Sequence, residues 1–532
     1  MPDPLTAVST RRTPQNVQAD PRQVLNSTGG YVFKLDELAQ IHRFLTIGTT
    51  GGTFYASEQK LTADNAAVVL EAARNNASAL VEHVVQVSTA GRAPRQNPAL
   101  FALAVCASLG DDEGRKAALD ALPRVARTGT HLFTFAAYAE QFRGWGRGMR
   151  RAVGSWYTGK SAQALVYQVL KYRQRVGWTH RDLLRLSHPE TSDPALRDLF
   201  EWVSRGSVGE HTPRMVEGFL AAKVCNTPGG MVRLINDYGL SWEMLPDEAL
   251  AFPEVWEALI LSGGLPMTAM IRQLPRLTRL GVLTPFSDTT NLVTDRLTDA
   301  DRLRRARVHP LNLLVAHRTY VNGVSLRGKS TWNPQRVVVD ALDQAFYAAY
   351  GAVEPAGKRT LVALDISGSM GWHTGDLGVT AREVAAAISL VTLNTEPQAN
   401  VVGFSHDIRP LSISPRQRLG DVIRYTSGLP FGATDCALAF RWAMTQREEY
   451  DTFVVVTDNE TNGGVGWSTS VHPHQALAQY RQKRVPEAKL VVVGVTATKC
   501  SIADPMDRGS LDIAGFDSAV PSLIANFSRG DV

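Results

Sequence analysis

The feature that most restricts the fold of this chain is an apolar segment that ends in a loop of the form Asp-x-Ser-x-Ser. The apolar run spans residues 361–364 and leads directly into Asp365, Ser367 and Ser369. A short run of this kind predicts a strand buried on both faces, as in a parallel sheet that is covered by helices. The polar loop would then lie at the carboxyl end of that strand.

Oxygen-bearing side chains from three separate segments are expected to meet beside this strand. The predicted metal ligands are Asp365, Ser367, Ser369, Thr434 and Asp458. Such oxygens suit Mg²⁺, or alternatively Ca²⁺ or Mn²⁺, whereas sites for Zn²⁺ or copper usually contain nitrogen or sulfur. The alternative is that Asp365 caps the following turn and the two serines face solvent. All five side chains would serve as ligands of the ion, so the set predicts binding rather than catalysis.

The last third of the chain alternates between apolar strands and helical stretches. The expected strands are 361–365, 399–404, 452–457 and 489–495. The expected helices are 377–393, 416–426, 435–447 and 473–483. This rhythm predicts an α/β domain with a doubly wound parallel sheet. Ligands of such sheets bind at the carboxyl ends of the strands, where both predicted aspartate ligands fall.

The preceding part of the chain has a different periodicity. From about residue 35 to residue 350, apolar residues recur at a spacing of three to four, interrupted by Gly, Pro or Asn. Short helices joined by short loops predict an α solenoid of HEAT-like helical repeats. We therefore expect a polar N-terminal arm over residues 1–30, a helical domain over 31–355 and the α/β domain over 356–532.

Charge is unevenly distributed between these parts. Residues 1–350 contain 40 Lys and Arg against 32 Asp and Glu, whereas residues 351–532 contain 16 against 19. The basic helical part predicts a polyanionic partner. The four cysteines are far apart, and neither a secretory signal nor a long apolar run is visible. These features predict a reduced, soluble, cytoplasmic protein that does not enter a membrane.

One basic area is expected around residue 175. Lys171 and Arg175 lie four residues apart, which would place them on one face of a helix. Arg173 and Arg181 enlarge this area, and His188 follows the next short helix. Cations of this kind bind phosphates, and an imidazole can donate to a phosphate or stack on a base. The alternative is a solvated face of an ordinary helix.

Two further basic groups are candidate RNA ligands. One comprises Arg143, Arg147, Arg150 and Arg151 around Trp145, with Trp156 close behind; the other comprises Arg304, Arg305 and Arg307 with Arg327 and Lys329. Arginines with interleaved aromatic residues suit single-stranded RNA. The alternative places the two tryptophans in the core between repeats. His131, between helical segments, is expected to be structural.

A competing motif lies between Gly323 and Ser330, which fits the P-loop expression G-x-x-x-x-G-K-S. A working P-loop follows a buried strand and runs directly into a helix. Here a helix is expected before the motif, and the next helix is expected to begin with Asn333 as its cap and Pro334 in its first turn. A basic loop is therefore favoured over a nucleotide site.

Several longer sequence motifs are distributed over nearly the whole chain. They lie at residues 36–48, 51–61, 130–135, 171–178 (Lys-Tyr-Arg-Gln-Arg-Val-Gly-Trp), 182–188 and 502–509. Together they strongly resemble the Ro ribonucleoprotein autoantigen and its bacterial relatives, whose helical part is the TROVE module. The Asp-x-Ser-x-Ser segment likewise resembles the metal-ion-dependent adhesion site (MIDAS) of von Willebrand factor A domains. The resemblance is weakest at about 200–260.

This resemblance implies a ring of helical repeats that is closed by the von Willebrand A-like domain. It implies Y RNA on the outer surface, where Lys171, Arg175 and His188 match family positions, and single-stranded 3′ ends of misfolded RNA in a basic central hole. It also implies exoribonuclease partners such as polynucleotide phosphorylase, and an acidic protein ligand on the metal. The expected protein is a monomer without catalytic residues. Two other functions stay open: a Mg²⁺-dependent protein-binding adaptor without an RNA role, and a P-loop NTPase.

Overall fold

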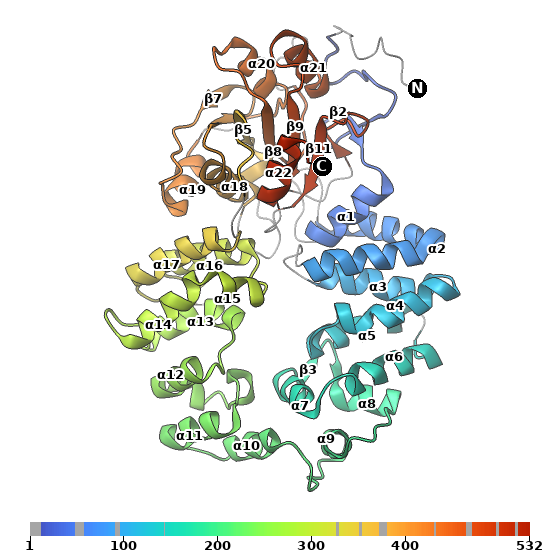
Figure 1. Cartoon of the computed structure of the whole chain (residues 1–532), viewed down its shortest axis with the longest axis vertical. Helices are drawn as coiled ribbons and strands as arrows, with labels where there is room; N and C mark the ends of the chain where they lie inside the picture. The colour runs from blue at the N-terminus through green and yellow to red at the C-terminus, as the bar shows by residue number, and fades with distance from the viewer. Residues whose placement is uncertain are drawn as a thin grey trace.

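The computed structural model describes residues 12–47, 58–90, 96–142, 144–325, 329–350, 354–371, 380–429, 432–463, 471–495, 500–515 and 520–531. Within these ranges the helices follow a ring-shaped path whose two ends meet an α/β domain (Figure 1). None of the helices in these ranges is both long and apolar enough to cross a membrane.

The first arm of the ring descends from the α/β domain to the far end of the molecule (Figure 1). Its helices are α1 (Glu37–Ile47), α2 (Glu58–Ala90), α3 (Asn97–Leu109), α4 (Asp112–Val125), α5 (Gly129–Phe142), α6 (Arg147–Thr158), α7 (Ala162–Lys171), α8 (His180–Ser187) and α9 (Pro194–Arg205). α2 packs on both α3 and α4, and α8 packs on both α6 and α9. Each helix therefore buries its apolar stripe against neighbouring repeats, as the solenoid pattern predicts.

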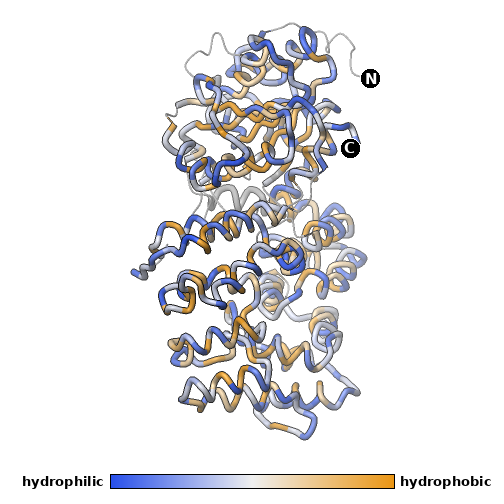
Figure 2. Tube along the Cα trace, turned by 60° about the vertical axis from the view of Figure 1, so that its left-hand side comes forward, coloured by the Kyte–Doolittle hydropathy of each residue, from blue (hydrophilic) through white to orange (hydrophobic). Residues whose placement is uncertain are grey.

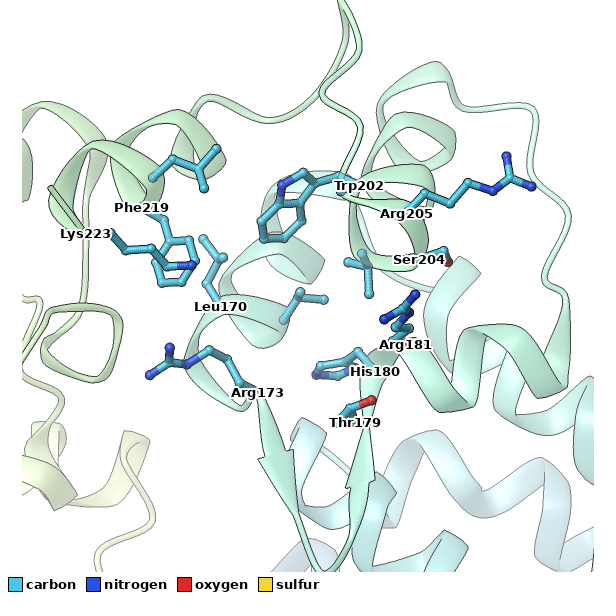
Figure 3. Close-up of a pocket in the computed structure, with 14 residues that line it drawn as sticks. Leu170, Arg173, Thr179, His180, Arg181, Trp202, Ser204, Arg205, Phe219 and Lys223 are labelled. Atoms are coloured by element: carbon cyan, nitrogen blue, oxygen red, sulfur yellow. The ribbon is translucent and has the colours of Figure 1, made fainter.

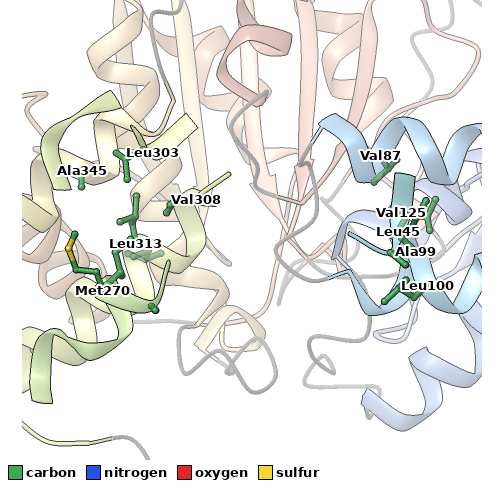
Figure 4. Packing of buried hydrophobic residues seen from close by; sticks show 14 of the residues in the cluster. Leu45, Val87, Ala99, Leu100, Val125, Met270, Leu303, Val308, Leu313 and Ala345 are labelled. Carbon is green, nitrogen blue, oxygen red and sulfur yellow. The ribbon is translucent and has the colours of Figure 1, made fainter. Parts of the chain in front are cut away.

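The second arm returns to the α/β domain. It consists of α10 (Arg214–Ala222), α11 (Pro228–Tyr238), η2 (Trp242–Met244), η3 (Ala249–Ala251), α12 (Pro253–Ser262), α13 (Met267–Arg279), α14 (Asp288–Thr298), α15 (Ala300–Arg305), α16 (Pro310–Asn322) and α17 (Arg336–Ala348). Buried apolar side chains fill the space between helices within each arm, such as Leu100 and Val125 in the first and Leu303 and Leu313 in the second (Figure 4).

Local sequence signals fix where many ring helices begin and end. The Ser161 side chain accepts a hydrogen bond from the Ala164 amide at the start of α7, and Asp193 caps α9 in the same way, just before Pro194. Such caps satisfy amide groups that have no partner inside the helix. α9 ends at Gly206, whose φ of 84° is a left-handed conformation that glycine adopts without strain. Short repeats with defined ends follow from these residues.

The α/β domain contains one six-stranded sheet in the order β11-β9-β8-β5-β6-β7. The strands are β5 (Thr360–Asp365), β6 (Ala399–Phe404), β7 (Ile408–Pro410), β8 (Thr452–Thr457), β9 (Lys489–Gly494) and β11 (Ser510–Ala514). All neighbours are parallel except β7, which pairs antiparallel with β6 at one edge. The four predicted strands and the doubly wound architecture are confirmed, whereas the two edge strands were not predicted.

Helices cover both faces of this sheet. They are α18 (Ala381–Thr395), α19 (Leu419–Ser427), α20 (Leu438–Thr445), α21 (Pro473–Lys483) and α22 (Val520–Arg529). Val362 and Leu364 of β5 belong to the apolar cluster that includes α18 and α22, whereas Leu361 and Ala363 belong to the cluster with α20 and α21. The central strands are therefore hydrophobic on both faces over most of their length, while the ring helices alternate between hydrophobic and hydrophilic residues (Figure 2).

The described part of the N-terminal arm lies on the α/β domain. Its strands β1 (Gln23–Leu25) and β2 (Tyr31–Lys34) pair antiparallel, and β2 also pairs with β10 (Cys500–Ser501). The buried Gln15 side chain donates a hydrogen bond of 2.7 Å to Asp435. The sequence predicts a polar arm over residues 1–30 but does not indicate this docking, because the contacts join residues more than 400 positions apart.

Ion pairs join both ends of the ring to the α/β domain. In the first arm, Arg43 of α1 is 2.7 Å from Asp512 of β11, and the Arg43 side chain is only 1% exposed. In the second arm, Arg318 of α16 is 2.6 Å from Glu383 of α18. Arg418, which precedes α19, is 2.9 Å from Asp340 of α17. The α/β domain therefore lies between the two ends of the ring (Figure 1), and ion pairs join it to both arms.

The described part of the P-loop-like segment does not have the geometry of a phosphate-binding loop. It follows helix α16 rather than a strand, and Val324 forms an isolated bridge with Thr331. α17 begins at Arg336 with Gln335 as its N-cap, two residues later than predicted, so Lys329 is not at a helix start. Residues 326–328, including Arg327, lie outside the described residues, as do Arg143 and the motif at 51–55.

Candidate metal centre and basic surfaces

Asp365 lies at the carboxyl end of β5 and is fully buried. Its Oδ1 accepts a hydrogen bond of 2.9 Å from the Ser367 amide, and its Oδ2 accepts one of 2.7 Å from the Thr457 hydroxyl. Ser367 Oγ lies 3.1 Å from Ser369 Oγ, in the first residue of the short helix η4 (Ser369–Gly371). Both serines are buried, so the alternative in which they face solvent is wrong. Asp365 caps the turn, as that alternative proposes, but it does so with Oδ1 alone.

The other two predicted ligands come from neighbouring loops. Asp458 follows β8, which pairs with β5, and it accepts a hydrogen bond from the Ser369 side chain. The Thr434 carbonyl accepts a hydrogen bond of 2.9 Å from the Asn462 amide, which holds the 434 loop against the loop after β8. The structure thus brings the three predicted segments together at the carboxyl edge of the sheet, as the parallel topology requires.

Electrostatics in this cluster favour a cation. Burial and the charge of Asp458 raise the pKa of Asp365 to about 7, and burial raises the pKa of Asp458 as well. Two buried carboxylates destabilise each other unless a positive charge lies near them. Arg382 of α18 supplies part of that charge and donates hydrogen bonds to the carbonyls of Ile366 and Ser367. The hydroxyl and carboxylate oxygens fit a hard divalent ion.

Within the described residues, no group of three or more His, Cys, Asp or Glu side chains is arranged to hold a metal. The candidate centre instead combines two carboxylates with hydroxyl groups, a donor set that differs from those of zinc or copper sites.

The expected helical face formed by Lys171 and Arg175 is wrong. α7 ends at Lys171, and Arg175 belongs to the short hairpin of β3 (Gln174–Arg175) and β4 (Trp178–Thr179), where it pairs with Trp178. Lys171 Nζ lies 3.5 Å from Glu243 and its side chain is only 9% exposed. Arg175 is exposed. The two positions differ because α7 ends at its C-cap Tyr172, and Val176 and Gly177, both with positive φ, then form the turn of the hairpin after Arg175.

The remaining residues of this area are exposed. Arg173 follows α7, Arg181 lies in the first turn of α8, and His188 ends α8 in a left-handed conformation with φ of 43°. The α8 start is fixed by a capping box between Thr179 and Asp182. The hairpin therefore positions Arg175, and the capping box fixes the start of the helix that carries Arg181.

A second basic surface lies between α4 and α6. Arg147, Arg151, Arg115 and Lys116 line a groove of about 560 Å³, together with Asp112 and Asp120. Arg150 is exposed on the same helix as Arg147. Trp156 is fully buried and donates a hydrogen bond to the Ala126 carbonyl, so the core alternative holds for this tryptophan. Trp145 is half-buried against Trp178, with ring centres 5.4 Å apart.

Charges from the two arms interact across the ring. Burial and the nearby Arg307 charge lower the pKa of Arg127, although Arg127 follows α4 in the first arm and Arg307 follows α15 in the second. His131, whose pKa is lowered to about 4 by burial and by Arg127, lies in the first turn of α5 beside this pair. Arg304 and Arg305 are exposed on α15, and Arg304 pairs with Asp301 at 2.6 Å. Arg127 was missed because one sequence cannot show which arms face each other.

Comparison with known proteins agrees with this architecture over the whole chain. Residues 24–211 and 208–331 match the TROVE domain, and residues 359–528 match the Ro60 vWA domain. The chain belongs to the Ro60 family. It is 43% identical to RNA-binding protein RO60 of Deinococcus radiodurans, with 99% of both chains covered, and 33% identical to RNA-binding protein RO60 of Caenorhabditis elegans, with 96% and 90% covered. The crystal structure of the D. radiodurans RO (RSR) protein matches with a TM-score of 0.72 at 42% identity, covering 93% of this chain and all of that one.

This Ro60-family ring also contains a pocket that sequence analysis only partly indicated. It lies at the junction of α7, α8, α9 and α10, has a volume of about 520 Å³, and is lined by Arg173, Arg181, Trp202, Phe219 and Lys223 among others (Figure 3). Lys223 Nζ lies 4.5 Å and Arg173 Cζ lies 5.7 Å from the centre of the Phe219 ring. Trp202, Phe219 and Lys223 were missed because they fall where the motif resemblance is weakest.

Proposed function

We propose that this Ro60-family chain is a non-catalytic, cytoplasmic RNA-binding ring that serves RNA quality control and maturation. It binds Y RNA on its outer surface and the single-stranded 3′ end of misfolded or immature RNA in the centre of the ring. It acts with exoribonucleases, such as polynucleotide phosphorylase tethered through RNA. The name that its relatives from D. radiodurans and C. elegans carry, RNA-binding protein RO60, supports RNA as the partner.

The observation that carries the central site is that exposed Arg307 of the second arm lies close enough to half-buried Arg127 of the first arm for its charge to add to burial in lowering the Arg127 pKa. Two cations from opposite arms would repel each other, and a polyanion between them removes that repulsion. An RNA strand supplies one phosphate per nucleotide and can pass between the arms without base-specific contacts. Exposed Arg304 and Arg305 extend the positive charge along the second arm.

The outer site is assigned to the exposed Arg175, Arg173, Arg181 and His188, with Arg147 and Arg150 on the neighbouring α4–α6 surface. Phosphate contacts by such side chains position an RNA duplex, whereas imidazole and aromatic groups contact unpaired bases. Lys171 contributes to this site indirectly, because its ion pair with Glu243 joins α7 to η2. It is not assigned a direct contact with phosphate.

The α/β domain is proposed to bind one divalent cation, Mg²⁺ or alternatively Ca²⁺ or Mn²⁺. Asp365, Ser367, Ser369, Thr434 and Asp458 would hold it, directly or through water. When bound, the ion supplies a positive coordination position for an acidic protein ligand. Because the two buried aspartates favour a cation, a Mg²⁺-dependent protein adaptor is the second candidate function. A protein complex that forms with Mg²⁺ and resists ribonuclease would favour the adaptor.

The deciding experiment is a gel-shift series across a range of salt concentrations. It compares a small hairpin RNA with the same hairpin carrying a single-stranded 3′ extension. Each phosphate neutralised on a single strand steepens the slope of log K against log salt by about 0.7. The proposal requires tighter, more salt-sensitive binding of the tailed RNA. Equal binding of the two RNAs at moderate salt would rule out the central site.

A further inference from the structure

The pocket between α7 and α10 combines the two features that bind a nucleotide. Its walls contain aromatic surface from Trp202 and Phe219, and its polar lining includes the cationic side chains of Arg173, Arg181 and Lys223. None of the side chains that line it is a carboxylate. Its volume of about 520 Å³ lies within the range of about 300–1,000 Å³ that is usual for small-ligand sites.

The cations and aromatic rings are arranged around a common opening (Figure 3). Lys223 and Arg173 lie on the Phe219 side, whereas Arg181 lies on the side of α8. Trp202 meets the Phe219 ring edge-on, at 6.4 Å between centres and 88° between planes. Phe219 is itself buried, so the half-buried Trp202 ring presents the aromatic surface that a ligand can reach.

Arg205 provides an internal contrast. It also lines the pocket, but its guanidinium lies 2.8 Å from Glu201 of the same helix and points away from the opening (Figure 3). Its charge is therefore directed to a neighbouring carboxylate rather than to the pocket. Lys223, by comparison, is exposed and directed toward the Phe219 ring.

We propose that this pocket binds one phosphorylated nucleotide unit, with its base against Trp202 and its phosphate between Lys223, Arg173 and Arg181. The chemistry is shared by a free nucleoside monophosphate and by an unpaired nucleotide of a bound RNA. The RNA source rests on the RNA-binding function proposed above, whereas the free nucleotide does not. Base stacking on an aromatic side chain is worth about 1–3 kcal/mol, which corresponds to about 5- to 150-fold in affinity.

The test uses the full-length chain and calorimetric titration with adenosine 5′-monophosphate, adenosine and inorganic phosphate. A single-stranded adenosine tetranucleotide forms the RNA arm. Lys223→Gln and Trp202→Leu are expected to weaken whichever nucleotide binds by at least about fivefold. Trp202→Phe retains a ring and is expected to retain most of the affinity, which separates stacking from a general packing effect. Arg205→Gln is the matched charge control and is expected to bind like the wild-type chain.

Four outcomes decide the proposal. Binding of the monophosphate, weakened by Lys223→Gln and Trp202→Leu alone, supports a free nucleotide. Binding of the tetranucleotide only, with the same pattern, supports an RNA unit. Inorganic phosphate that binds as tightly as the monophosphate overturns the role of the base. Equal effects of Lys223→Gln and Arg205→Gln, or no effect of either, overturn the pocket. If the pocket proposal is wrong, the hairpin RNA still binds more tightly with its 3′ tail than without it. If the proposed central site is wrong, that dependence on the tail is absent.

Discussion

Lys171 Nζ lies 3.5 Å from Glu243 Oε1, so a cation that the family resemblance assigns to Y RNA already forms an ion pair with another residue of the helical domain. The two side chains are only 9% and 21% exposed. The same Nζ lies 3.3 Å from the Tyr167 hydroxyl. The pair joins the end of α7 to η2 and thereby holds the basic hairpin that follows α7. Lys171 has a structural role that the exposed Arg175 does not share.

Lys171→Met is therefore expected to lower the free energy of unfolding by about 3 kcal/mol, because it leaves the Glu243 carboxylate partly buried without its partner. Arg175→Met is expected to change the free energy of unfolding by less than about 0.5 kcal/mol, because Arg175 is a surface residue. The same variant is expected to weaken the binding of Y-type RNA. Urea unfolding and gel shifts on both variants measure this difference. Wild-type stability of Lys171→Met would contradict the structural role.

The candidate metal centre is expected to make stability depend on Mg²⁺. An ion that binds only the folded chain stabilises it by about 2.7 kcal/mol at a hundredfold excess over its Kd. Wild-type chain should therefore unfold at a higher temperature with Mg²⁺ or Mn²⁺, whereas Asp365→Asn should show no shift. Asp421→Asn, at an exposed site on α19 of the same domain, is the control and should retain the shift. An unchanged Mg²⁺ shift in Asp365→Asn would place the ion elsewhere.

The sheet and its polar edge could be predicted from the sequence because both depend on local patterns. Apolar runs of fixed length locate β5, β6, β8 and β9, and the parallel topology alone then brings Asp365 beside Asp458. The docking of β2 on β10 and the pairing of Lys171 with Glu243 could not be predicted, because each depends on residues that are distant in sequence.

The same reasoning explains the error at Arg175. A spacing of four residues predicts a shared helical face only while the helix continues. Here Tyr172 ends α7 and a two-residue turn with positive φ follows Arg175. Glycine at 177 indicates such a turn, but valine at 176 does not, since branched residues rarely adopt that conformation.

Stability of the first arm should decrease on acidification through His180. Burial lowers the pKa of His180 to about 4 from its ordinary value near 6.5, and its Nδ1 lies 2.8 Å from the Tyr157 hydroxyl. The unfolded chain binds the proton more readily, so the stability that neutral His180 contributes is present above pH 6.5 and is lost as the pH falls toward 4. A difference of 2.5 pKa units amounts to about 3 kcal/mol.

The measurement is urea unfolding of wild-type chain and His180→Gln at several pH values between 7.5 and about 4.5. The stability advantage of the wild type should narrow as the pH falls, because glutamine does not titrate. His188→Gln, at an exposed site, should follow the wild-type curve. A constant difference between wild type and His180→Gln would contradict the buried neutral imidazole.

The closure of the ring depends on Arg43 and Asp512. Arg43→Met is expected to destabilise the chain by about 3–5 kcal/mol, because it breaks an ion pair whose cation is buried. Asp512→Asn removes the opposite charge and should cost a similar amount. The double variant should cost less than the sum of the two single variants, because it removes both charges and so leaves no buried charge without its partner. Unfolding free energies of the four chains give the coupling, and additive costs would show that the pair does not join the domains.

The repulsion between Arg127 and Arg307 predicts opposite effects on stability and on binding. Arg307→Ala removes a charge that lowers the Arg127 pKa, so it should leave the chain as stable as the wild type or slightly more stable. It should also weaken binding of RNA with a single-stranded 3′ tail and reduce the salt slope by about 0.7, the contribution of one phosphate contact. Perturbed pKa values are concentrated at functional sites, so the lowered pKa of Arg127 favours a binding role for Arg127 and Arg307. A cation with a structural role would instead lower the stability of the chain when it is removed. Thermal unfolding and gel shifts with tailed and untailed hairpins test both effects, and Arg233→Ala, at an exposed position of α11 in the same arm, controls for removal of a positive charge. If Arg307→Ala lowers stability and leaves tail binding unchanged, Arg307 belongs to the scaffold and the RNA strand follows another path.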